Sequence, residues 1–345
     1  MRPVLSIVLP VYNERENLDP VLSEIEEVHR QALAERCELE VLFVDDGSTD
    51  GSTEVLERLA RERQHVRVVV FSRNFGHQAA ISAGYRYATG DAVVTMDSDQ
   101  QHPAAVIGRM VQQWESGYDV IYAVRDAQRG GIVKRTCSRA FYRLFNLLSP
   151  TKILPGGADF RLVTRDVLKA LDQLPERCRF MRGLIPWLGF RSQKVTYEQR
   201  QRAAGQPKFR FLHSVGLGIT ALTGFSVAPL RASLLLGVLF LIVSIGYLVY
   251  CFVDWLGGGE VVRGWPSIVA LIILTQGMML VAFGIQAEYL AKIIAEVKRR
   301  PEYIVREVIG SAATADDQGA ASGQTQEASQ SPTDSGSARA GGESS

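Results

Sequence analysis

The sequence predicts an α/β domain with a mostly parallel β-sheet, followed by two transmembrane helices. In the N-terminal part of this 345-residue chain, short runs rich in Val, Ile and Leu alternate with helical patterns. That order is typical of a parallel sheet with helices on both faces. Two runs without a charged residue follow, at 234–252 and 268–285, and a helix needs roughly 20 apolar residues to cross a bilayer. A buried helix would show a similar run, but two such runs at one end of the chain favour membrane spans.

Each element of the α/β part is indicated by its hydrophobic period. Leu18, Leu22 and Ile25 recur with the spacing of one helix face, whereas the strands are short continuous apolar runs. Polar clusters end three of the strands, and in a parallel sheet these ends meet at one edge, where ligands bind. The pattern predicts strands at 6–12, 39–47, 66–72, 91–99 and 118–125, and helices at 17–33, 53–63 and 77–88.

Composition and motifs argue against several classes of function. The formal net charge of +1 gives no reason to expect nucleic acid as a partner. The four cysteines show no C-x-x-C spacing, which argues against both a zinc site and a disulfide framework. A G-x-G-x-x-G motif does not follow the first strand, which argues against a dinucleotide-binding dehydrogenase.

The distribution of basic residues predicts the orientation in the membrane. Cytoplasmic flanks of membrane spans carry an excess of Lys and Arg. Arg263 is the single basic residue between the two apolar runs. We therefore expect this segment to be a short outer loop and both termini to lie in the cytoplasm. The protein would then be a multi-pass protein of the cell inner membrane. The basic residues on the expected cytoplasmic flanks are Lys208, Arg210, Arg231, Lys292, Lys298, Arg299 and Arg300.

Five regions are expected along the chain. An amphipathic pattern before the first span predicts a helix at the membrane surface, and residues 134–148 show a similar pattern, with an ordinary surface helix as the alternative. The C-terminal stretch is rich in Ser, Ala, Gly, Gln and Thr and cannot bury enough surface to become ordered. The regions are a cytoplasmic catalytic domain at 1–208, a juxtamembrane amphipathic helix at 209–230, two transmembrane helices at 231–290, a cytoplasmic helix at 291–310 and a disordered tail at 311–345.

Asp97 and Asp99 end a hydrophobic strand and suggest a metal site. Residues i and i+2 of an extended chain face the same way, so the two carboxylates can share one target. Paired acids need a compensating cation, and hard oxygen ligands select Mg²⁺ or Mn²⁺. Gln101 can add a carbonyl oxygen. Solvated turn acids are the alternative, and the position at the end of a buried strand favours the metal.

Three further acids and one arginine are candidates for the site. Asp45 and Asp46 follow a buried strand and can accept hydrogen bonds from a nucleobase or a ribose, although a turn leading into a helix cap is the alternative. Arg125 ends an apolar strand, where it can meet a diphosphate. Asp159 follows two glycines in a segment that can fold back under the site, and an ordinary loop acid is the alternative.

These segments together resemble the glycosyltransferase family 2 enzymes that load a sugar onto a polyprenyl phosphate. The resemblance covers roughly residues 3–308. It implies a GT-A nucleotide-sugar-binding fold and a metal-dependent, inverting sugar transfer. The segments that carry it are SIVLPVYNERENL, VDDGSTDGS, SRNFGHQAAISAG, GDAVVTMDSDQQHP, GGADFRL, RFMRG and EYLAKIIAEVKRRPEY.

The resemblance also implies roles for individual residues. Asp97, Asp99 and Gln101 match the family's metal ligands, and Asp99, Arg125 and Asp159 form the expected catalytic set. Asp159 matches an acid proposed as catalytic base, but a phosphate nucleophile is already ionised, so we expect Asp159 to orient the reactants. The matches to the nucleoside pocket are Pro10, Tyr12, Glu14, Asp45 and Asp46, and the matches to phosphate or acceptor binding, besides Arg125, are Arg135, Arg202 and Lys208.

The resemblance implies a nucleotide-sugar donor and a polyprenyl-phosphate acceptor. UDP-glucose and undecaprenyl phosphate are the first choices, and UDP-N-acetylglucosamine, UDP-formamidoarabinose and GDP-mannose are alternative donors. A dimer or tetramer formed through the spans is expected. A processive membrane polysaccharide synthase would need a Q-x-x-R-W motif, which the sequence lacks, and more spans. A non-catalytic membrane scaffold would need degraded metal and nucleoside motifs, and these are intact.

Overall fold

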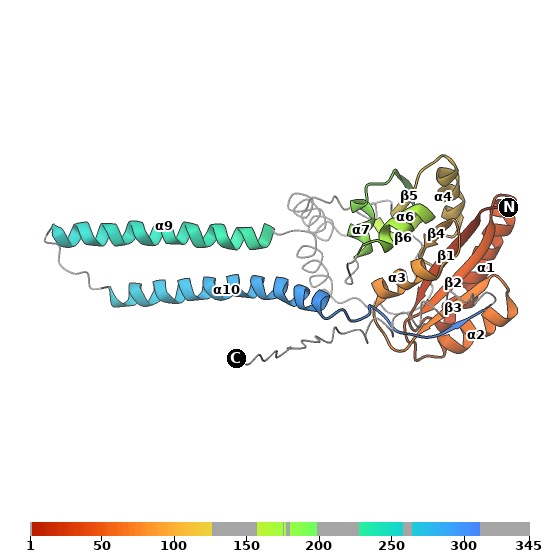
Figure 1. The fold of residues 1–345 in the computed structure, drawn as a ribbon, viewed down its shortest axis with the longest axis horizontal. Helices are drawn as coiled ribbons and strands as arrows, with labels where there is room; N and C mark the ends of the chain where they lie inside the picture. Colours follow the sequence, from red (N-terminus) through yellow and green to blue (C-terminus); the bar gives the residue numbers. More distant parts are fainter. Residues whose placement is uncertain are drawn as a thin grey trace, which may run out of the picture.

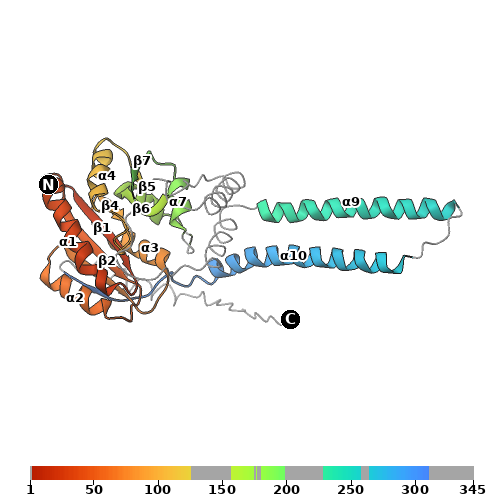
Figure 2. The same cartoon turned by 180° about the vertical axis from the view of Figure 1, so that it is seen from behind.

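The computed structural model of the chain describes residues 2–125, 157–174, 176, 180–198, 228–257 and 264–310. In these residues an α/β domain is joined to two long helices that extend from it side by side (Figure 1). Seen from behind, the beginning of the first long helix and the end of the second lie at the side of the domain (Figure 2). The domain and the helical pair are therefore distinct parts of the molecule.

One eight-stranded sheet forms the centre of the domain, in the order β7-β5-β6-β4-β1-β2-β3-β8. β6 and β8 run antiparallel to their neighbours and the remaining pairs are parallel, which confirms the expected mostly parallel α/β fold. The strands are β1 Val4–Val11, β2 Glu38–Asp45, β3 Val66–Phe71, β4 Ala92–Thr95, β5 Val120–Arg125, β6 Gly157–Thr164, β7 Ser192–Tyr197 and β8 Val305–Ile309.

Helices cover both faces of the sheet. Residues of α1, α2 and α4 share one hydrophobic layer, and residues of α3, α6 and α7 share the other. The helices are η1 Arg15–Asn17, α1 Leu18–Val28, η2 His29–Leu33, α2 Ser52–Glu62, α3 His77–Tyr87, α4 Ala105–Glu115, α6 Arg165–Asp172, α7 Met181–Trp187, α9 Ala228–Leu256 and α10 Trp265–Val297.

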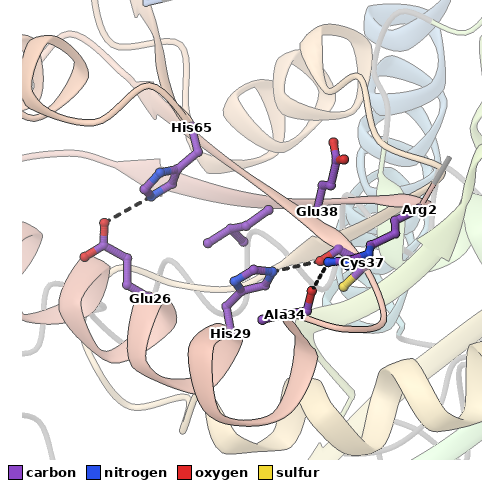
Figure 3. Close-up of a pocket in the computed structure, with 8 residues that line it drawn as sticks. Arg2, Glu26, His29, Ala34, Cys37, Glu38 and His65 are labelled. Atoms are coloured by element: carbon purple, nitrogen blue, oxygen red, sulfur yellow. Dashed lines mark hydrogen bonds and ion pairs between the residues drawn. The ribbon is translucent and has the colours of Figure 1, made fainter.

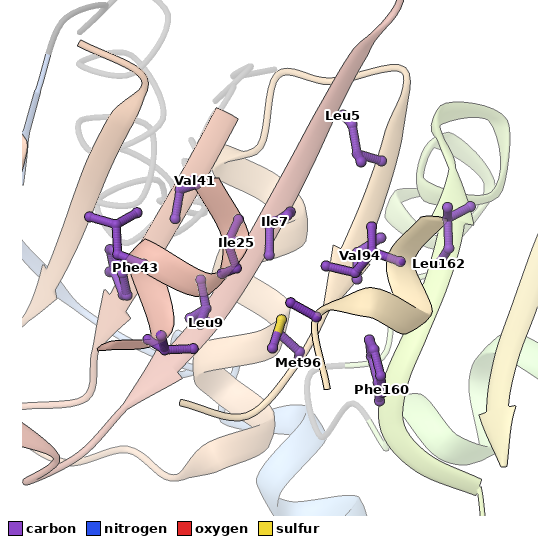
Figure 4. Packing of buried hydrophobic residues seen from close by; sticks show 14 of the residues in the cluster. Leu5, Ile7, Leu9, Ile25, Val41, Phe43, Val94, Met96, Phe160 and Leu162 are labelled. Atoms are coloured by element: carbon purple, nitrogen blue, oxygen red, sulfur yellow. The ribbon is translucent and has the colours of Figure 1, made fainter. Parts of the chain in front are cut away.

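Alternate residues of the central strands supply the two hydrophobic layers. Ile7 and Leu9 of β1 lie in the layer that also contains Ile25 of α1 (Figure 4), whereas Val8 lies in the opposite layer beneath α3. Burying an aliphatic side chain of this size stabilises the fold by about 1.5–3 kcal/mol. α3 lies so close to β1 that a Cβ on Gly84 would stand 2.1 Å from Val8 Cγ1, so this crossing requires glycine.

The segment after α10 ends in a strand, and the helix expected at 291–310 is wrong beyond Val297. Arg299 has a left-handed backbone with φ of 50°, and Pro301 follows, two features that end a helix. β8 then pairs antiparallel with β3 at the edge of the sheet. The α/β domain is consequently built from two chain segments separated by the long helices, and not from residues 1–208 alone.

The two expected transmembrane helices correspond in position to α9 and α10. Among the described residues, one segment, Leu274–Val297, is long and apolar enough to cross a membrane, with 24 residues and a mean hydropathy of 1.5. α9 contains a shorter apolar stretch, Ser233–Tyr247. The structure therefore supports one candidate span, and the second span stays a prediction.

Several expectations concern residues outside the described ranges. They are the helix at 134–148, the juxtamembrane helix as far as residue 227, and the tail at 311–345. Arg135, Arg202 and Lys208 lie in the same undescribed parts of the chain. These expectations stay predictions.

Candidate active site

The loops after β1, β2 and β4 lie at one edge of the sheet, as the sequence predicts. β1 lies between β2 and β4 and is parallel to both. Ser98, in the loop after β4, donates a hydrogen bond of 3.1 Å to the carbonyl oxygen of Pro10. The backbone N–H of Asp46, after β2, donates to the carbonyl oxygen of Val11 at 2.9 Å. The three polar strand ends thus surround the end of β1.

The loop after β1 places Tyr12 and Glu14 at this edge. Asn13, between them, has a left-handed backbone with φ of 54°, and its side-chain oxygen accepts the N–H of Thr49 at 2.8 Å. The N–H of Glu14 donates to Ser52 Oγ at 3.1 Å. These bonds fix the loop to the segment after β2, and the Tyr12 side chain remains accessible to a ligand because the residue is 40% exposed.

Asp45 is fully buried and closes the turn after β2. Its Oδ1 accepts the N–H of Ser48 at 2.9 Å, and its Oδ2 accepts the hydroxyl of Thr53 at 2.5 Å. Both oxygens therefore stabilise the turn that leads into α2, which is the structural role given above as the alternative to nucleoside binding. Each carboxylate oxygen has a second lone pair, so contact between Asp45 and a nucleoside stays a prediction.

Asp46 ties β2 to the loop between β3 and α3. Its Oδ1 accepts the N–H of Phe75 at 2.6 Å, and its Oδ2 accepts the N–H of Gly76 at 2.9 Å. Burial raises the pKa of this carboxyl, although the two N–H donors oppose the shift. The two loops approach so closely that a Cβ on Gly47, which has φ of 71°, would lie 2.5 Å from the carbonyl carbon of Arg73.

A buried histidine holds the loop that carries Asp97 and Asp99. The N–H of Asp97 donates to His102 Nδ1 at 3.1 Å, and Asp99 Oδ1 accepts the N–H of Gln101 at 3.1 Å. The His102 ring stacks on Phe160 with their centroids 4.9 Å apart. Burial lowers the pKa of His102, so the ring is neutral and carries its proton on Nε2, which lies 3.7 Å from Asp97 Oδ2. His102 therefore holds the backbone of Asp97, and its Nε2 lies near the carboxylate of that residue without a hydrogen bond to it.

Asp159 lies in β6, the neighbour of β4, and is held by two arginines. Arg182 Nη2 lies 2.8 Å from Asp159 Oδ2, and the guanidinium of Arg161 bonds to Oδ1. Burial alone would raise the pKa of Asp159, but the hydrogen bond from His77 and the charges of both arginines hold it well below its usual range. A carboxylate of such low basicity is a poor proton acceptor near pH 7.

His77 lies between the two acids, although sequence reasoning did not single it out. Its Nε2 lies 3.4 Å from Asp159 Oδ2 and 3.6 Å from Asp97 Oδ1. Burial opposes protonation, but the bond to Asp159 and the charges of both acids outweigh it and raise the pKa of His77. The available signal was its position as the first residue of α3, directly after the loop held by Asp46.

Arg125 ends β5 close to the acidic loop. Its Nε donates to Tyr197 Oη at 3.3 Å. The charges of Asp97 and Asp99 act on Tyr197, and burial together with these charges raises the pKa of that phenol despite the bond from Arg125. Arg125 and the acid pair Asp97 and Asp99 therefore lie around the same two residues, Tyr197 and His102, and their shared role in a site stays a prediction. His102 and Arg182 are further candidates for it, and the signal for Arg182 was its place in the segment RFMRG.

The oxygen donors at Asp97 and Asp99 fit a hard divalent cation. Two carboxylates and the amide oxygen of Gln101 are ligand types that Mg²⁺ and Mn²⁺ prefer. The Asp97 side chain is 32% exposed, and His102 Nε2 beside it is buried without a hydrogen-bond partner among the described residues. Within the same residues, no three His, Cys, Asp or Glu side chains gather as a metal cluster. A cation here therefore needs further oxygens from Gln101, water or a substrate.

A hollow lies at the opposite end of the strands. It has a volume of about 460 Å³ and is lined by residues at the end of α1 and the beginning of β2 (Figure 3). His65 Nε2 lies 3.0 Å from Glu26 Oε1, and His29 Nε2 lies 2.9 Å from the carbonyl oxygen of Cys37. Because none of the predicted site residues lines this hollow, we place the functional site at the end of the sheet that carries Asp97.

Sequence comparison defines the class of protein to which this fold and site belong. Glycosyl transferase family 2 matches residues 6–172, a range that includes all three polar strand ends and Asp159. Together with the relatives described next, this match shows that the chain belongs to glycosyl transferase family 2 and is a transferase enzyme of GT-A-like fold.

The curated relatives match nearly the whole chain. The SfII prophage-derived bactoprenol glucosyl transferase of Shigella flexneri is 35% identical over 303 residues, which cover 88% of this chain and 97% of the relative. A prophage bactoprenol glucosyl transferase homolog of Escherichia coli is 34% identical over 305 residues, with coverages of 88% and 99%. An uncharacterized glycosyltransferase of Synechocystis is 35% identical over 307 residues, with coverages of 89% and 96%.

The solved structures that match the chain have lower identity. A mannosyltransferase from Pyrobaculum calidifontis in complex with GDP-Man and Mn²⁺ is 18% identical, with a TM-score of 0.45, and the match covers 95% of this chain and 81% of that one. TarS of S. aureus in complex with UDP is 17% identical, with a TM-score of 0.43 and coverage of 64% of each chain.

Proposed function

We propose that the protein transfers glucose from UDP-glucose to undecaprenyl phosphate, with inversion at the sugar, at the cytoplasmic face of the inner membrane. The observation that carries the proposal is that the loop after β4, with Asp97 and Asp99, and Asp159, near the beginning of the antiparallel strand β6, meet beside the basic side chains of His77 and Arg182. The names of the relatives support the acceptor and the sugar, because bactoprenol is undecaprenol.

The acceptor chemistry explains why this site needs no strong base. The nucleophile is a phosphate oxygen that is already ionised at neutral pH, so the enzyme gains most by holding it in line with the sugar. Asp159 is suited to that task, since its low pKa makes it a fixed acceptor and not a proton carrier. His77 and Arg182, which both contact Asp159, would set the direction of its carboxylate.

The leaving group requires positive charge. Departure of the nucleotide places new negative charge on its terminal phosphate, which basic side chains stabilise. Arg125 at the end of β5 would serve this task, and Arg135, Arg202 and Lys208 are the further candidates by resemblance. Asp97, Asp99 and Gln101 would hold Mg²⁺ or Mn²⁺, which when bound neutralises the diphosphate. The side chains of the site thus take little part in covalent chemistry, and they act by stabilising charge and by positioning the substrates.

Membrane attachment follows from the acceptor. A polyprenyl phosphate presents its headgroup at the bilayer surface, and α9 and α10 leave the domain as a pair of apolar helices. The segment Leu274–Val297 supports at least one span. With both helices inserted, the α/β domain and both termini would lie on the side that carries the basic flanks, and oligomers would form through the spans.

The proposal is tested with the full-length protein in lipid nanodiscs. Purified protein is incubated with undecaprenyl phosphate, Mg²⁺ and one labelled donor at a time: UDP-glucose, UDP-N-acetylglucosamine, UDP-formamidoarabinose or GDP-mannose. We expect one lipid-linked sugar per acceptor, formed fastest from UDP-glucose. Transfer of another sugar would correct the donor, chain extension would indicate a polysaccharide synthase, and transfer from none of the donors would overturn the proposal. The Asp99→Ala variant serves as the matched negative control.

A further inference from the structure

The strand that follows α10 brings a buried aromatic ring to the edge of the catalytic domain. Tyr303, just before β8, is only 4% exposed and belongs to the hydrophobic layer beneath α3. Its ring stacks on Phe71, the last residue of β3, with centroids 5.0 Å apart and planes inclined by 9°. The N–H of Ser72 donates to the carbonyl oxygen of Ile304 at 3.0 Å. The C-terminal segment therefore meets β3 at the point where its loop begins.

A continuous set of contacts leads from Tyr303 to the site. Phe71 packs edge-on against Phe75 with centroids 5.8 Å apart, and the Arg73 guanidinium lies 4.0 Å from the centroid of the Phe75 ring. Phe75 and the next residue in turn donate their N–H groups to Asp46. The ring of Tyr303 thus supports, through Phe71, the loop that joins a predicted nucleoside-binding acid to the first residue of α3.

A second contact reaches α3 itself. Arg86, near the C-terminal end of α3, lies close enough to the Tyr303 hydroxyl for its charge to act on the phenol. Burial raises the pKa of this phenol, so the hydroxyl is neutral at physiological pH. The opposite end of α3 carries His77, which contacts Asp97 and Asp159. Tyr303 therefore contacts both elements that flank the β3–α3 loop.

We propose that Tyr303 is a positioning residue for the donor site, and that β8 couples the end of α10 to the loop 72–77. The inference rests on the proposed function, because it assumes that the nucleotide binds beside the loop 72–77 and Asp46. Tyr303 touches no reacting atom; it acts by holding Phe71 and Phe75, and through them the two N–H groups that bind Asp46. The stacked ring carries this support, and the hydroxyl contributes less.

An alternative role for β8 is to cover an exposed sheet edge. Edge strands offer unpaired N–H and C=O groups, and covering them prevents association with other chains. A strand with that role alone would stabilise the domain without changing how the loop 72–77 is held. The two roles are therefore distinguished by the loop's own order and by nucleotide affinity in variants that remain folded.

The experiment compares three variants of the full-length protein in nanodiscs. Tyr303→Leu keeps a large apolar side chain but removes the stacked ring, and Tyr303→Phe restores the ring without the hydroxyl. Arg306→Ala is the matched control, because Arg306 lies on β8 close to Tyr303 in the sequence, is exposed and pairs with its neighbour Glu307. Hydrogen exchange of the peptide spanning residues 70–80 and the Kd for UDP in the presence of Mn²⁺ are measured for each protein.

We expect Tyr303→Leu to speed amide exchange in residues 72–77 and to weaken UDP binding about 10-fold, equivalent to about 1.4 kcal/mol. The KM for undecaprenyl phosphate should change less than 2-fold. Tyr303→Phe and Arg306→Ala should match the wild type. A folded Tyr303→Leu protein with unchanged exchange and affinity would overturn the inference, and so would equal losses in the phenylalanine variant.

Failure of the inference and failure of the proposed function give different results. If the wild type binds neither UDP nor GDP, the proposed nucleotide-sugar donor is wrong. Exchange in residues 72–77 still reports whether Tyr303 orders the loop, because it requires no ligand. If Tyr303→Leu unfolds, exchange would rise throughout the domain, including the peptide that spans α4, and that result would assign the residue to stability and overturn the positioning role.

Discussion

Asp159 and Arg182 form an ion pair between β6 and α7, with Arg182 Nη2 2.8 Å from Asp159 Oδ2. The acid is almost fully buried, whereas 34% of the Arg182 side chain is exposed. Arg161, on the same strand as Asp159, is buried and bonds to the other carboxylate oxygen. The Asp159 carboxylate thus neutralises the buried guanidinium of Arg161 and orients the guanidinium of Arg182, which is accessible to a substrate.

This arrangement predicts that Asp159→Asn is more destabilising than Arg182→Gln. The first change leaves the buried Arg161 without a counter-charge, and breaking a buried pair costs about 3–5 kcal/mol. The second change leaves Asp159 paired with Arg161, and we expect a loss of about 1 kcal/mol, typical of a partly exposed pair. Urea unfolding of both variants in detergent measures the difference. Equal losses would contradict the assigned roles.

The same contacts predict how stability depends on pH. The folded state holds the pKa of Asp159 below its unfolded value of about 3.9, so the stabilisation is fully present above that pH. It is lost as the pH falls through the lower pKa of the folded state. The Asp159 contribution to the difference in unfolding free energy between wild type and Asp159→Asn should therefore shrink below about pH 4. Asp159 also raises the pKa of His77, so the difference should be larger below about pH 6.5 than above the raised pKa of His77. A difference that did not shrink between pH 5 and pH 3 would refute the assignment.

Metal dependence is predicted from the acidic loop. Asp99→Ala should reduce transfer at least about 100-fold, because electrostatic stabilisation of the leaving group is lost. Its melting temperature should stay within a few degrees of the wild type, since the hydrogen bond that Asp99 Oδ1 accepts from Gln101 is local and the same loop is also held by His102. Initial rates with added Mg²⁺ or Mn²⁺ measure the effect, and Asp166→Ala, an exposed acid of α6, is the control. Full turnover in excess EDTA would show that no metal is required.

The acceptor site is tested at Arg135, which the sequence places in an amphipathic basic segment. Arg binds phosphate bidentately, and Lys cannot reproduce that planar geometry. Arg135→Lys should raise the KM for undecaprenyl phosphate roughly 10- to 150-fold, as expected for about 1.5–3 kcal/mol. The KM for the donor should change much less. Loss of donor affinity with the acceptor KM intact would move Arg135 to the diphosphate pocket.

Membrane topology is tested by cysteine labelling in intact cells. Gly257 follows α9 at the expected outer loop, whereas Ser116 lies on the α/β domain. An impermeant thiol reagent should label Gly257→Cys from outside and should reach Ser116→Cys only after the cells are permeabilised. Labelling of Ser116→Cys in intact cells, or protection of Gly257→Cys, would contradict two spans with a cytoplasmic domain.

The positions of the first five strands along the chain and the end of the sheet that carries the site could be predicted because both follow from local patterns. Continuous apolar runs identified β1 to β4, and polar residues after three of them identified the edge. Asp97 and Arg125 were found in this way, since each stands at a strand end. For these two residues, the charge of the side chain and its position at a strand end both indicate a site residue.

Long-range contacts could not be predicted from the same patterns. His77 is a site residue only because α3 begins beside Asp159, which lies far along the chain. The sequence placed Asp45 and Asp46 at the site but could not reveal that their oxygens bind backbone N–H groups of nearby loops. β8 was missed for a further reason: the preceding helical pattern continued toward it, and pairing with β3 decides its conformation.

The discontinuous sheet has a consequence for synthesis of the protein. β3 is translated early, yet its partner β8 leaves the ribosome only after both long apolar helices have been made. During that interval the nascent domain presents an open strand edge, and open edges of this kind recruit other chains. A polypeptide that terminates between α10 and β8 would keep the edge of β3 unpaired permanently. Completion of the catalytic fold is thereby delayed until the hydrophobic helical pair has already emerged.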